Sequence, residues 1–365
     1  MKLLPFVSLL LLVSCGHFKG PERKTRKLQV AWIKNQDPKH SSGNLPIALN
    51  SPIIKEGLVF VGHNDGHMMA YELSNGRVIW RKKDGDSYLY NGTPLFHNDQ
   101  IIYGTNSGRI YSRHYLTGES KYMIDLGSSV DGKGVVYKDK LFFHLRSHKM
   151  FCLDANTGKI LWSYRRSVPY LSTLQRVSTP LIVDGVIYIG FADGHLAAFK
   201  VEDGLMLWEQ RLSNGTKFLD VDVSPTIVDG LLYTASLAGP FSVLNPKTGE
   251  ILRQVDVTPT RPPVYVDNKF IFGTTAGEVL IIDKDLNIKH RVKLSIRNVS
   301  SVVKFKGNIV AATMEGDIFF LDKNNLKILD KRFLGHAYSA VFGDISSDQD
   351  RMAFLSSRNR LYIFK

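Results

Sequence analysis

Hydrophobic residues in this chain come in short runs that polar turn signals interrupt at regular intervals. The stretch STPLIVDGVIYIGFADGHLAAFKVEDGLMLW, from Ser178 to Trp208, shows the pattern most clearly. Its apolar runs are separated by Asp-Gly pairs at 184–185, 193–194 and 203–204. Short runs of β-branched and aromatic residues favour strands, and Asp-Gly pairs favour tight hairpin turns. The pattern predicts four short antiparallel strands that form one unit.

The unit recurs along the chain. Aligned on the turn before its second strand, it occurs at Gly57, Asp99, Asp139, Gly185, Gly230, Asn268, Gly307 and Asp350. The average step is about 42 residues, which is the spacing of four-stranded propeller blades. A second aligned position also recurs. The last strand of the unit ends in tryptophan at Trp80, Trp162 and Trp208. The sequence therefore predicts an all-β fold, an eight-bladed β-propeller of four-stranded antiparallel blades.

The two ends of the repeat region complement each other. Residues 28–32 (LQVAW) resemble the last strand of a blade but have no blade of their own, whereas the eighth unit stops at 361–365, one strand short. We therefore expect the N-terminal strand to complete the eighth blade and close the ring. Closure of this kind removes the exposed sheet edges of an open stack. The predicted propeller domain covers residues 28–365.

The N-terminal segment has the pattern of a lipoprotein signal. Residues 1–14 contain one lysine and an apolar core that is too short to span a bilayer. This core leads into Leu12-Val13-Ser14-Cys15, which resembles a bacterial lipobox, so we expect Cys15 to be lipidated after cleavage. Gly16 in place of aspartate favours the outer membrane. Residues 15–27 are polar and basic, and we interpret them as a flexible tether between the lipid anchor and the folded domain.

The chain is basic, with 47 Lys and Arg against 34 Asp and Glu and a formal net charge of +13. Such a balance raises nucleic-acid binding as one option. The basic residues are scattered through the predicted turns, however, and the lipobox directs the chain out of the cytoplasm. We therefore expect no nucleic-acid partner. Anionic lipid and an acidic partner surface both remain open as the counterpart of this charge.

Few residues suggest chemistry. His63 and His67, like His144 and His148, are four residues apart, but in strand–turn–strand segments we expect them to diverge at surface positions. Cys152 is predicted to be a buried free thiol, since its column otherwise holds small residues. The sequence predicts no catalytic residue, no metal site and no cofactor.

Two acidic segments need separate attention. Residues 283–287 (DKDLN) mimic the start of a calcium loop, but Ile288 and Leu294 stand where that loop needs Gly and Glu. We interpret this segment as a hairpin turn. In the last blade, acidic residues that could gather into a weak ion-binding loop are Asp344, Asp348 and Asp350.

The repeat resembles the pyrroloquinoline-quinone-type propeller family, and the best copy of its blade signature is DANTGKILW at 154–162. That family contains quinoprotein dehydrogenases and non-enzymatic scaffolds. The dehydrogenases are longer and carry two adjacent cysteines against the cofactor, a pair that this chain lacks. The resemblance therefore implies a scaffold and not an enzyme.

Within that family, the chain resembles the lipoproteins that assist assembly of outer-membrane β-barrels. The specific part is Asp220-Val221-Asp222-Val223-Ser224-Pro225 at the entry to a blade, together with the preceding loop 171–176 (LSTLQR). The resemblance implies an outer-membrane lipoprotein on the periplasmic face that aids barrel insertion. Its partners would be the periplasmic transport-associated domains of the barrel-forming subunit, and unfolded outer-membrane proteins. The implied partner-binding residues are Leu171, Leu174, Gln175, Arg176, Asp220 and Asp222.

Several alternatives remain open at this point. Either aspartate, Asp220 or Asp222, contacts the partner or only caps the turn before Pro225. Leu171 and Leu174 are either exposed anchors or packing groups beneath the blades. The chain could also bind a different envelope partner, or, less in keeping with its cysteines, act as a quinoprotein enzyme.

Overall fold

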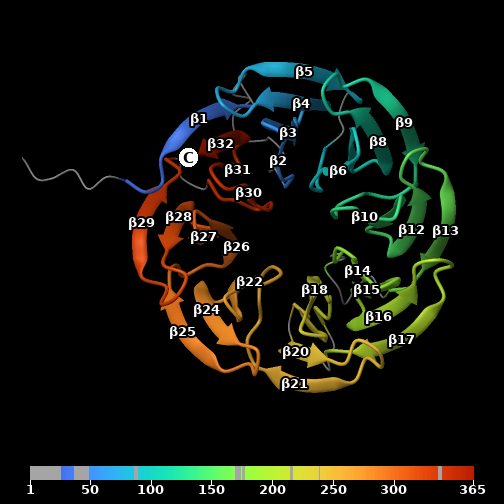
Figure 1. Cartoon of the computed structure of the whole chain (residues 1–365), viewed down its shortest axis with the longest axis vertical. Coiled ribbons are helices and arrows are strands. Elements are labelled where there is room, and N and C mark those ends of the chain that lie inside the picture. Colours follow the sequence, from blue (N-terminus) through green and yellow to red (C-terminus); the bar gives the residue numbers. More distant parts are fainter. Residues whose placement is uncertain are drawn as a thin grey trace, which may run out of the picture.

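The computed structural model describes residues 26–36, 49–85, 89–168, 174, 177–213, 217–237, 239–335 and 339–365. These residues form eight antiparallel sheets of four strands that stand around a central axis as the blades of a propeller (Figure 1). The predicted all-β, eight-bladed architecture is confirmed. The described residues contain no helix, and hence none long and apolar enough to cross a membrane.

The first four blades are continuous in sequence. Blade 1 contains β2 (Ile53–Lys55), β3 (Leu58–Gly62), β4 (His67–Glu72) and β5 (Val78–Lys83). Blade 2 contains β6 (Leu95–His97), β7 (Gln100–Gly104), β8 (Arg109–His114) and β9 (Ser120–Asp125). Blade 3 contains β10 (Val135–Tyr137), β11 (Lys140–His144), β12 (Lys149–Asp154) and β13 (Ile160–Arg165). Blade 4 contains β14 (Leu181–Val183), β15 (Val186–Gly190), β16 (His195–Lys200) and β17 (Met206–Arg211).

The next three blades are also continuous, and the last is composite. Blade 5 contains β18 (Val223–Val228), β19 (Leu231–Ala235), β20 (Phe241–Leu244) and β21 (Ile251–Val255). Blade 6 contains β22 (Val264–Val266), β23 (Lys269–Gly273), β24 (Glu278–Asp283) and β25 (Ile288–Lys293). Blade 7 contains β26 (Val299–Phe305), β27 (Asn308–Thr313), β28 (Asp317–Leu321) and β29 (Ile328–Phe333). Blade 8 contains β30 (Ser346–Ser347), β31 (Met352–Leu355), β32 (Arg360–Phe364) and β1 (Val30–Asn35).

The N-terminal strand closes the ring, as the sequence predicted. β1 pairs antiparallel with β32, from Val30 opposite Phe364 to Asn35 opposite Arg360, with one irregularity between Val30 and Trp32. The sheet order β1-β32-β31-β30 makes β1 the outermost strand of blade 8. Both ends of the propeller domain therefore lie in one blade, and the sheet that they form is as wide as the other seven.

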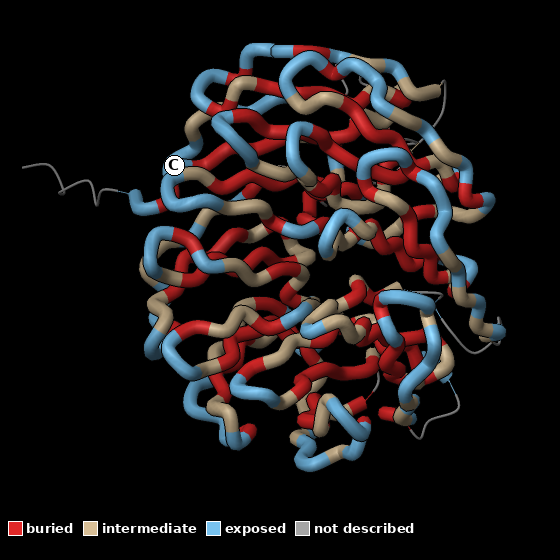
Figure 2. Tube along the Cα trace, turned by 45° about the vertical axis from the view of Figure 1, so that its right-hand side comes forward, coloured by how far each residue is buried: buried red, intermediate tan, exposed pale blue. Residues whose placement is uncertain are grey.

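The second and third strands of each blade supply the core. β3 and β7 are buried at every residue, because both faces of a blade pack against neighbouring blades. The outer strands alternate instead: β13 and β17 expose every second side chain from their middle onwards. Figure 2 shows this division, with buried strands inside and exposed segments at the turns and the rim.

Tight turns join the first two strands of most blades. Asp184 (φ 49°) and Gly185 (φ 78°) both take the left-handed conformation, and the same holds for Lys306 and Gly307. Two consecutive residues with positive φ define the type I′ turn, whose twist matches that of a hairpin. The Asp-Gly signals that marked the repeat therefore correspond to real hairpin turns. In blade 8 this turn is longer, and Asp348 N–H donates to the Arg351 carbonyl at 2.9 Å.

Five junctions between blades are built from an aromatic ring and a glycine; we call them aromatic seams. In one, the Trp80 indole donates to the Tyr115 carbonyl of the next blade at 2.7 Å. A Cβ on Gly118 would lie 2.8 Å from that indole, so only glycine fits there. The strand residue opposite Trp80 is the small Ala70. The five pairs are Trp32–Gly76, Trp80–Gly118, Tyr122–Gly158, Trp162–Gly204 and Trp208–Gly249.

The other three junctions use leucine in place of glycine; we call them leucine seams. Leu326 has a φ of 60°, is 1% exposed, and packs in the same core cluster as Ile281 of the preceding blade. The outer strand of that blade carries His290, not tryptophan, opposite Ile281. A large residue on the third strand and a leucine in the turn thus fill the space that the indole fills elsewhere. The corresponding sets are Val243–Arg253–Leu286, Ile281–His290–Leu326 and Phe320–Asp330–Leu28.

The propeller has two different ends. Because the strands of a blade alternate in direction, the connections from each blade to the next lie at the same end as the turns between second and third strands. We call this end the long-loop face; its blade-to-blade connections include 126–134, 166–180, 212–222 and 256–263. The opposite end, the short-turn face, carries the tight turns described above.

Candidate partner-binding site

Asp220 anchors one long loop to another. Its side chain is fully buried, and Oδ2 accepts a hydrogen bond from the Leu174 backbone N–H at 3.1 Å. Its own carbonyl accepts from the Leu237 N–H at 2.7 Å. The carboxylate therefore holds the loop before blade 4 against the loop before blade 5. The bonded amide lies 46 residues earlier in the chain, a contact that the sequence interpretation did not include.

Two further contacts join blades 4 and 5 in the same region. The Thr179 N–H donates to Ser224 Oγ at 2.8 Å, and the Val221 N–H donates to the Phe191 carbonyl at 3.0 Å. Gly190 permits this approach, because a Cβ there would lie 2.1 Å from the Val221 carbonyl oxygen. Sequence reasoning did not single out Thr179, which matches no motif, or Ser224, which stands inside the aspartate motif. The described parts of the two loops are thus held together at the junction of blades 4 and 5.

The predicted site residues divide by accessibility. Leu174 is 47% exposed, and Asp222 is partly exposed beside it on the wall of a cavity of about 530 Å³ at the long-loop face. Val177 and Leu237 line the same cavity. Leu171, Gln175 and Arg176 lie outside the described residues. Of the six predicted residues, the structure thus places Leu174 and Asp222 at the surface and Asp220 beneath them.

Hydrogen bonds and an ion pair link polar side chains around the mouth of this cavity. Asp131 accepts from Asn91 Nδ2 at 2.9 Å and pairs with Arg146 Nε at 2.5 Å. On the other side, Arg261 donates to the Phe342 carbonyl at 2.5 Å. These contacts join connections of different blades, so they brace the mouth. Cationic and anionic side chains are both present there.

The acidic residues of the last blade do not gather. Asp344 lines the cavity, where its Oδ1 is 3.7 Å from Arg261. Asp348 lies in a separate hollow at the short-turn face, and its Oδ1 accepts from the N–H groups of Asp350 and Arg351. The suggested ion-binding cluster is therefore wrong. Within the described ranges, no three His, Cys, Asp or Glu side chains are arranged to hold a metal ion.

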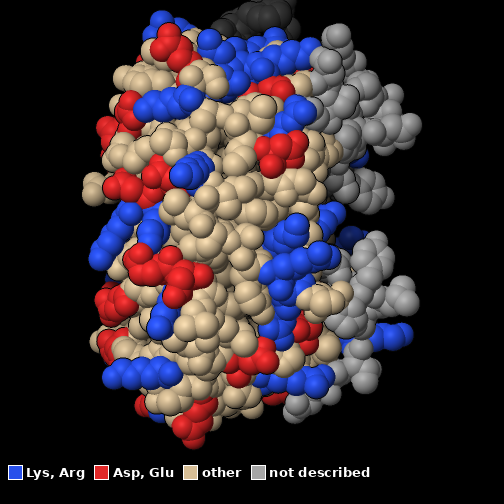
Figure 3. All heavy atoms as spheres, turned by 90° about the vertical axis from the view of Figure 1, so that its right-hand side faces the viewer, with Lys and Arg blue, Asp and Glu red and all other residues tan. Residues whose placement is uncertain are grey.

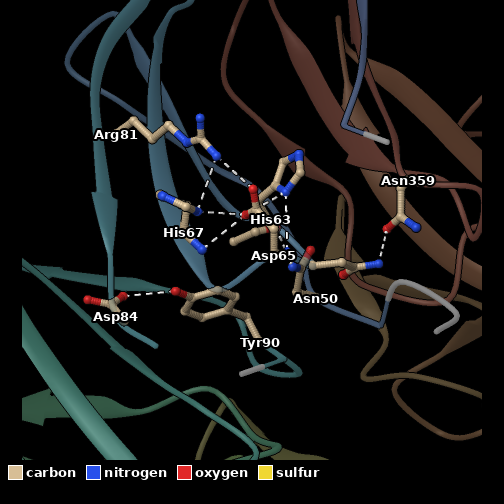
Figure 4. Close-up of polar contacts among 10 residues, drawn as sticks. Asn50, His63, Asp65, His67, Arg81, Asp84, Tyr90 and Asn359 are labelled. Carbon is tan, nitrogen blue, oxygen red and sulfur yellow. Dashed lines mark hydrogen bonds and ion pairs between the residues drawn. The ribbon is translucent and has the colours of Figure 1, made fainter. Parts of the chain in front are cut away.

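The expectation that His63 and His67 diverge is also wrong. Both rings turn toward Asp65, with Nδ1 atoms 2.7 and 2.9 Å from Oδ1, and Arg81 pairs with Oδ2 at 2.7 Å (Figure 4). Burial lowers the pKa of His63 despite the neighbouring carboxylate. Burial would raise the pKa of Asp65, but the hydrogen bond from His67 and the nearby cationic groups lower it on balance. The carboxylate organises a turn of blade 1, far from the loops of blades 4 and 5.

His144 and His148 are buried, not at the surface as expected. Their ring centroids are 5.5 Å apart, and His144 Nδ1 is 3.3 Å from the Ser178 carbonyl. Burial, followed by the charge of His148, lowers the pKa of His144 to about 3. Ser178 lies in the loop before blade 4, so this pair contacts the loop that carries Leu174.

Arg166 supports the start of the same loop. Its guanidinium is 2.5 Å from Asp193 and 2.7 Å from Glu209, and it lies over the Phe191 ring. Burial alone would lower the pKa of Arg166, but its hydrogen bonds to Glu209 and Asp193 raise it. Sequence reasoning did not single out Arg166; its position directly after β13 is the only signal.

Two other sequence interpretations, the buried Cys152 and the turn at residues 283–287, are confirmed. Cys152 is fully buried, and burial raises the pKa of its thiol to about 12, so the thiolate nucleophile is not available near neutral pH. Asp283 Oδ1 accepts from the N–H groups of Asp285 and Asn287, as a turn-capping aspartate does.

On the outer wall near β9 and β13, Lys and Arg are interspersed with Asp and Glu over most of the surface (Figure 3).

The described residues define an eight-bladed β-propeller with a cavity of about 530 Å³ at its long-loop face. A model of the family described as "Outer membrane protein assembly factor BamB" matches residues 44–133 and 120–322. The chain therefore belongs to the BamB family of outer membrane protein assembly factors, which are not enzymes.

Similar proteins cover nearly the whole chain. BamB of Escherichia coli K12 is 22% identical over 346 residues, which is 88% of this chain and 88% of that protein. BamB of Yersinia pestis is 21% identical over 84% of this chain and 81% of its own length. The crystal structure of BamB from Moraxella catarrhalis has a TM-score of 0.77 at 19% identity, covering 93% of this chain and 99% of that one.

The same fold occurs in enzymes. A quinohemoprotein alcohol dehydrogenase from Pseudomonas putida has a TM-score of 0.72 with 12% identity, covering 93% of this chain and 76% of that chain. At this identity the likeness concerns the fold alone. Blade architecture alone therefore does not distinguish scaffolds from dehydrogenases. The family assignment makes that distinction.

Proposed function

We propose that this chain is a scaffold lipoprotein of the outer-membrane β-barrel assembly machinery, held at the periplasmic face of the outer membrane. It binds the periplasmic transport-associated domains of the barrel-forming subunit and so aids the insertion of outer-membrane proteins. Unfolded outer-membrane proteins are further partners in this proposal. Membership of the BamB family supports the general role, since its named members are outer membrane protein assembly factors.

One observation carries the proposed site: buried Asp220 holds the backbone of exposed Leu174. An apolar side chain displayed on a fixed backbone loses little freedom on binding, which favours affinity. Asp222 adds a partly exposed carboxylate on the same cavity wall. In this proposal Leu174 and Asp222 contact the partner, together with Leu171, Gln175 and Arg176, and Asp220 is a positioning residue.

The test is a titration of the barrel-forming subunit against the purified full chain in detergent. Leu174→Ala and Asp222→Asn should each weaken binding at least tenfold, because each removes a group at the contact. Asp220→Asn should weaken binding and also increase hydrogen exchange at the Leu174 amide, since a positioning role acts through that backbone.

Leu116→Ala is the matched control, because Leu116 is 50% exposed but lies in a turn of the short-turn face. It should bind as the wild type does. Unchanged binding by Leu174→Ala and Asp222→Asn would contradict the site while leaving the scaffold role. A wild-type chain that fails to bind the subunit would contradict the proposed function itself.

Attachment through Cys15 is proposed on the lipobox pattern. Mass spectrometry of the N-terminal peptide should show acyl groups on Cys15, and Cys15→Ser should move the protein from the membrane fraction to the soluble fraction. Cys152 provides the internal control, because this buried thiol should carry no lipid. Retention of the Cys15→Ser protein in the outer membrane would show that another contact holds it there.

A further inference from the structure

Phe218 has an unfavourable backbone conformation for its residue type. Its φ is 57°, in the left-handed region where Cβ crowds the following carbonyl oxygen. Gly, Asn and Asp adopt this region most readily, and a bulky aromatic residue there is an outlier. Such outliers persist only where surrounding structure holds them, and they concentrate at functional positions.

Packing within the chain accounts for the other apolar residues of this kind, but not for Phe218. Among the described residues with positive φ, the other large apolar side chains are Leu286 and Leu326, which are 6% and 1% exposed. Both fill the leucine seams, so burial of their side chains offsets the strain. Phe218 is 50% exposed and belongs to no core cluster. No comparable burial offsets its strain.

The residues after Phe218 hold it in place. Leu219 is 8% exposed and packs close to Gly194, whose Cβ position would lie 3.2 Å from Leu219 Cβ. Asp220 and Val221 are buried and bonded as described above. The backbone that follows Phe218 is therefore held in place, while Phe218 itself stays exposed. Side-chain entropy lost on binding would be small for an aromatic group presented in this way.

Phe218 shares its support with Leu174. The carboxyl group of Asp220, two residues after Phe218, is the hydrogen-bond acceptor for the Leu174 amide. The segment that carries Phe218 thus also holds the backbone of Leu174 through a buried carboxylate. Exposed Lys217 precedes the ring, so the apolar group has a cationic neighbour. A central aromatic anchor with polar groups around it is the usual composition of an interface hot spot.

We propose that Phe218 is a principal apolar anchor of the partner interface, inserted into an apolar pocket on a folded domain of the barrel-forming subunit. This inference rests on the function proposed above and adds a contact residue to it. Continuity with Leu174 and Asp222, through the shared support, identifies that domain as the occupant. A lipid surface and a second copy of this chain are the competing occupants.

The decisive variant is Phe218→Gly, because glycine removes the ring and also accepts a positive φ without strain. Binding of the purified subunit should weaken at least tenfold, while the melting temperature of the chain should stay equal or rise. Phe218→Ala should weaken binding equally. Phe218→Tyr should restore it, since the ring is kept.

Leu286→Gly is the matched control, with the same change at a buried left-handed residue. It should lower the melting temperature and leave binding unchanged. Wild-type affinity in Phe218→Gly, or a fall in its melting temperature like that of Leu286→Gly, would overturn the anchor while leaving the proposed function intact. No binding by the wild-type chain would overturn both.

Two further measurements examine the competing occupants. The chain with Cys15→Ser is incubated with phosphatidylethanolamine–phosphatidylglycerol vesicles, and its mass in solution is measured by light scattering. Neither vesicle binding nor self-association should depend on Phe218. Loss of either one in Phe218→Gly would overturn the folded domain as the occupant.

Discussion

The aromatic seams and the leucine seams solve one packing problem with different residues. At the junction of blades 1 and 2, the large indole of Trp80 requires Gly118 in a turn of the next blade. It also requires the small Ala70 on the strand beside it. Between blades 6 and 7, a large aliphatic residue (Ile281) lies beside polar His290, and Leu326 enters from the next blade. Both kinds of seam are filled by large side chains, whereas the element that supplies them changes.

The difference teaches what the repeat requires. Close packing penalises both voids and overlaps, so the residues at a seam must change together. Leu286 and Leu326 stand in turns where glycine stands elsewhere, and they accept a positive φ in order to fill the seam. Backbone strain is tolerated there because buried leucine outweighs it.

The largest effect is expected from Trp80→Ala, which empties an aromatic seam. Trp80 is 6% exposed and also loses its hydrogen bond to the Tyr115 carbonyl. The free energy of unfolding should fall by about 3–5 kcal/mol. Denaturant unfolding of the purified chain measures it. A loss below about 1 kcal/mol would mean that the indole is not a principal contact of the seam.

A smaller effect is expected from Leu326→Gly in a leucine seam. Removing this buried side chain costs about 2–5 kcal/mol, and glycine relieves about 1–2 kcal/mol of left-handed strain. The net loss in the free energy of unfolding should be about 1–3 kcal/mol, by the same measurement. Leu326→Ala should be less stable than Leu326→Gly. The opposite order would show that the strain at 326 is negligible.

Acidification should weaken the region of blades 3 and 4 in particular. Burial holds the pKa of His144 at about 3, below the ordinary histidine value of 6.5, so the unfolded chain binds the proton more readily. Stability is therefore complete above pH 6.5 and falls as the pH drops from 6.5 toward 3. Between pH 7 and pH 6 the contribution of this one group is under about 1 kcal/mol.

Denaturant unfolding at a series of pH values checks this. His144→Gln should flatten the dependence, and Leu326→Gly, which keeps His144, should retain the wild-type slope. An unchanged slope in His144→Gln would assign the acid sensitivity to other groups.

The smallest expected effect is a change in the reactivity of the Cys152 thiol. Cys152 lies opposite Trp162 in an aromatic seam and is fully buried. In a Cys15→Ser background a thiol reagent should leave the native chain unmodified. Trp162→Ala should expose Cys152 and allow slow labelling, whereas Leu286→Gly should not. Rapid labelling of the otherwise unaltered chain would contradict the buried position.

The sequence predicted the fold better than the site. Turn pairs such as Asp184-Gly185 and columns such as Trp80, Trp162 and Trp208 were sufficient for eight blades and for ring closure. The leucine seams were missed, because a search for recurring identical residues does not register compensating ones. Each of those substitutions makes sense only with its neighbour in the next blade.

The function of Asp220 depends on a contact that no local pattern contains. The aspartate motif was visible in the sequence, but its acceptor role toward Leu174 joins segments 46 residues apart. The convergence of His63 and His67 on Asp65 was missed for a related reason. Spacing along a strand predicts opposite directions only while the strand is regular, and a tight turn lies between these two histidines.

The composite blade also constrains when this protein can fold. β1 is among the first segments to leave a ribosome or a translocation channel, and its pairing partner β32 is the last strand to follow. Until then blade 8 lacks an outer strand and β1 has an unpaired edge, which is prone to non-native pairing. Closing a loop of this length also carries an entropic cost that only the finished ring repays. Blade 8 can therefore be completed only once both β1 and β32 are available.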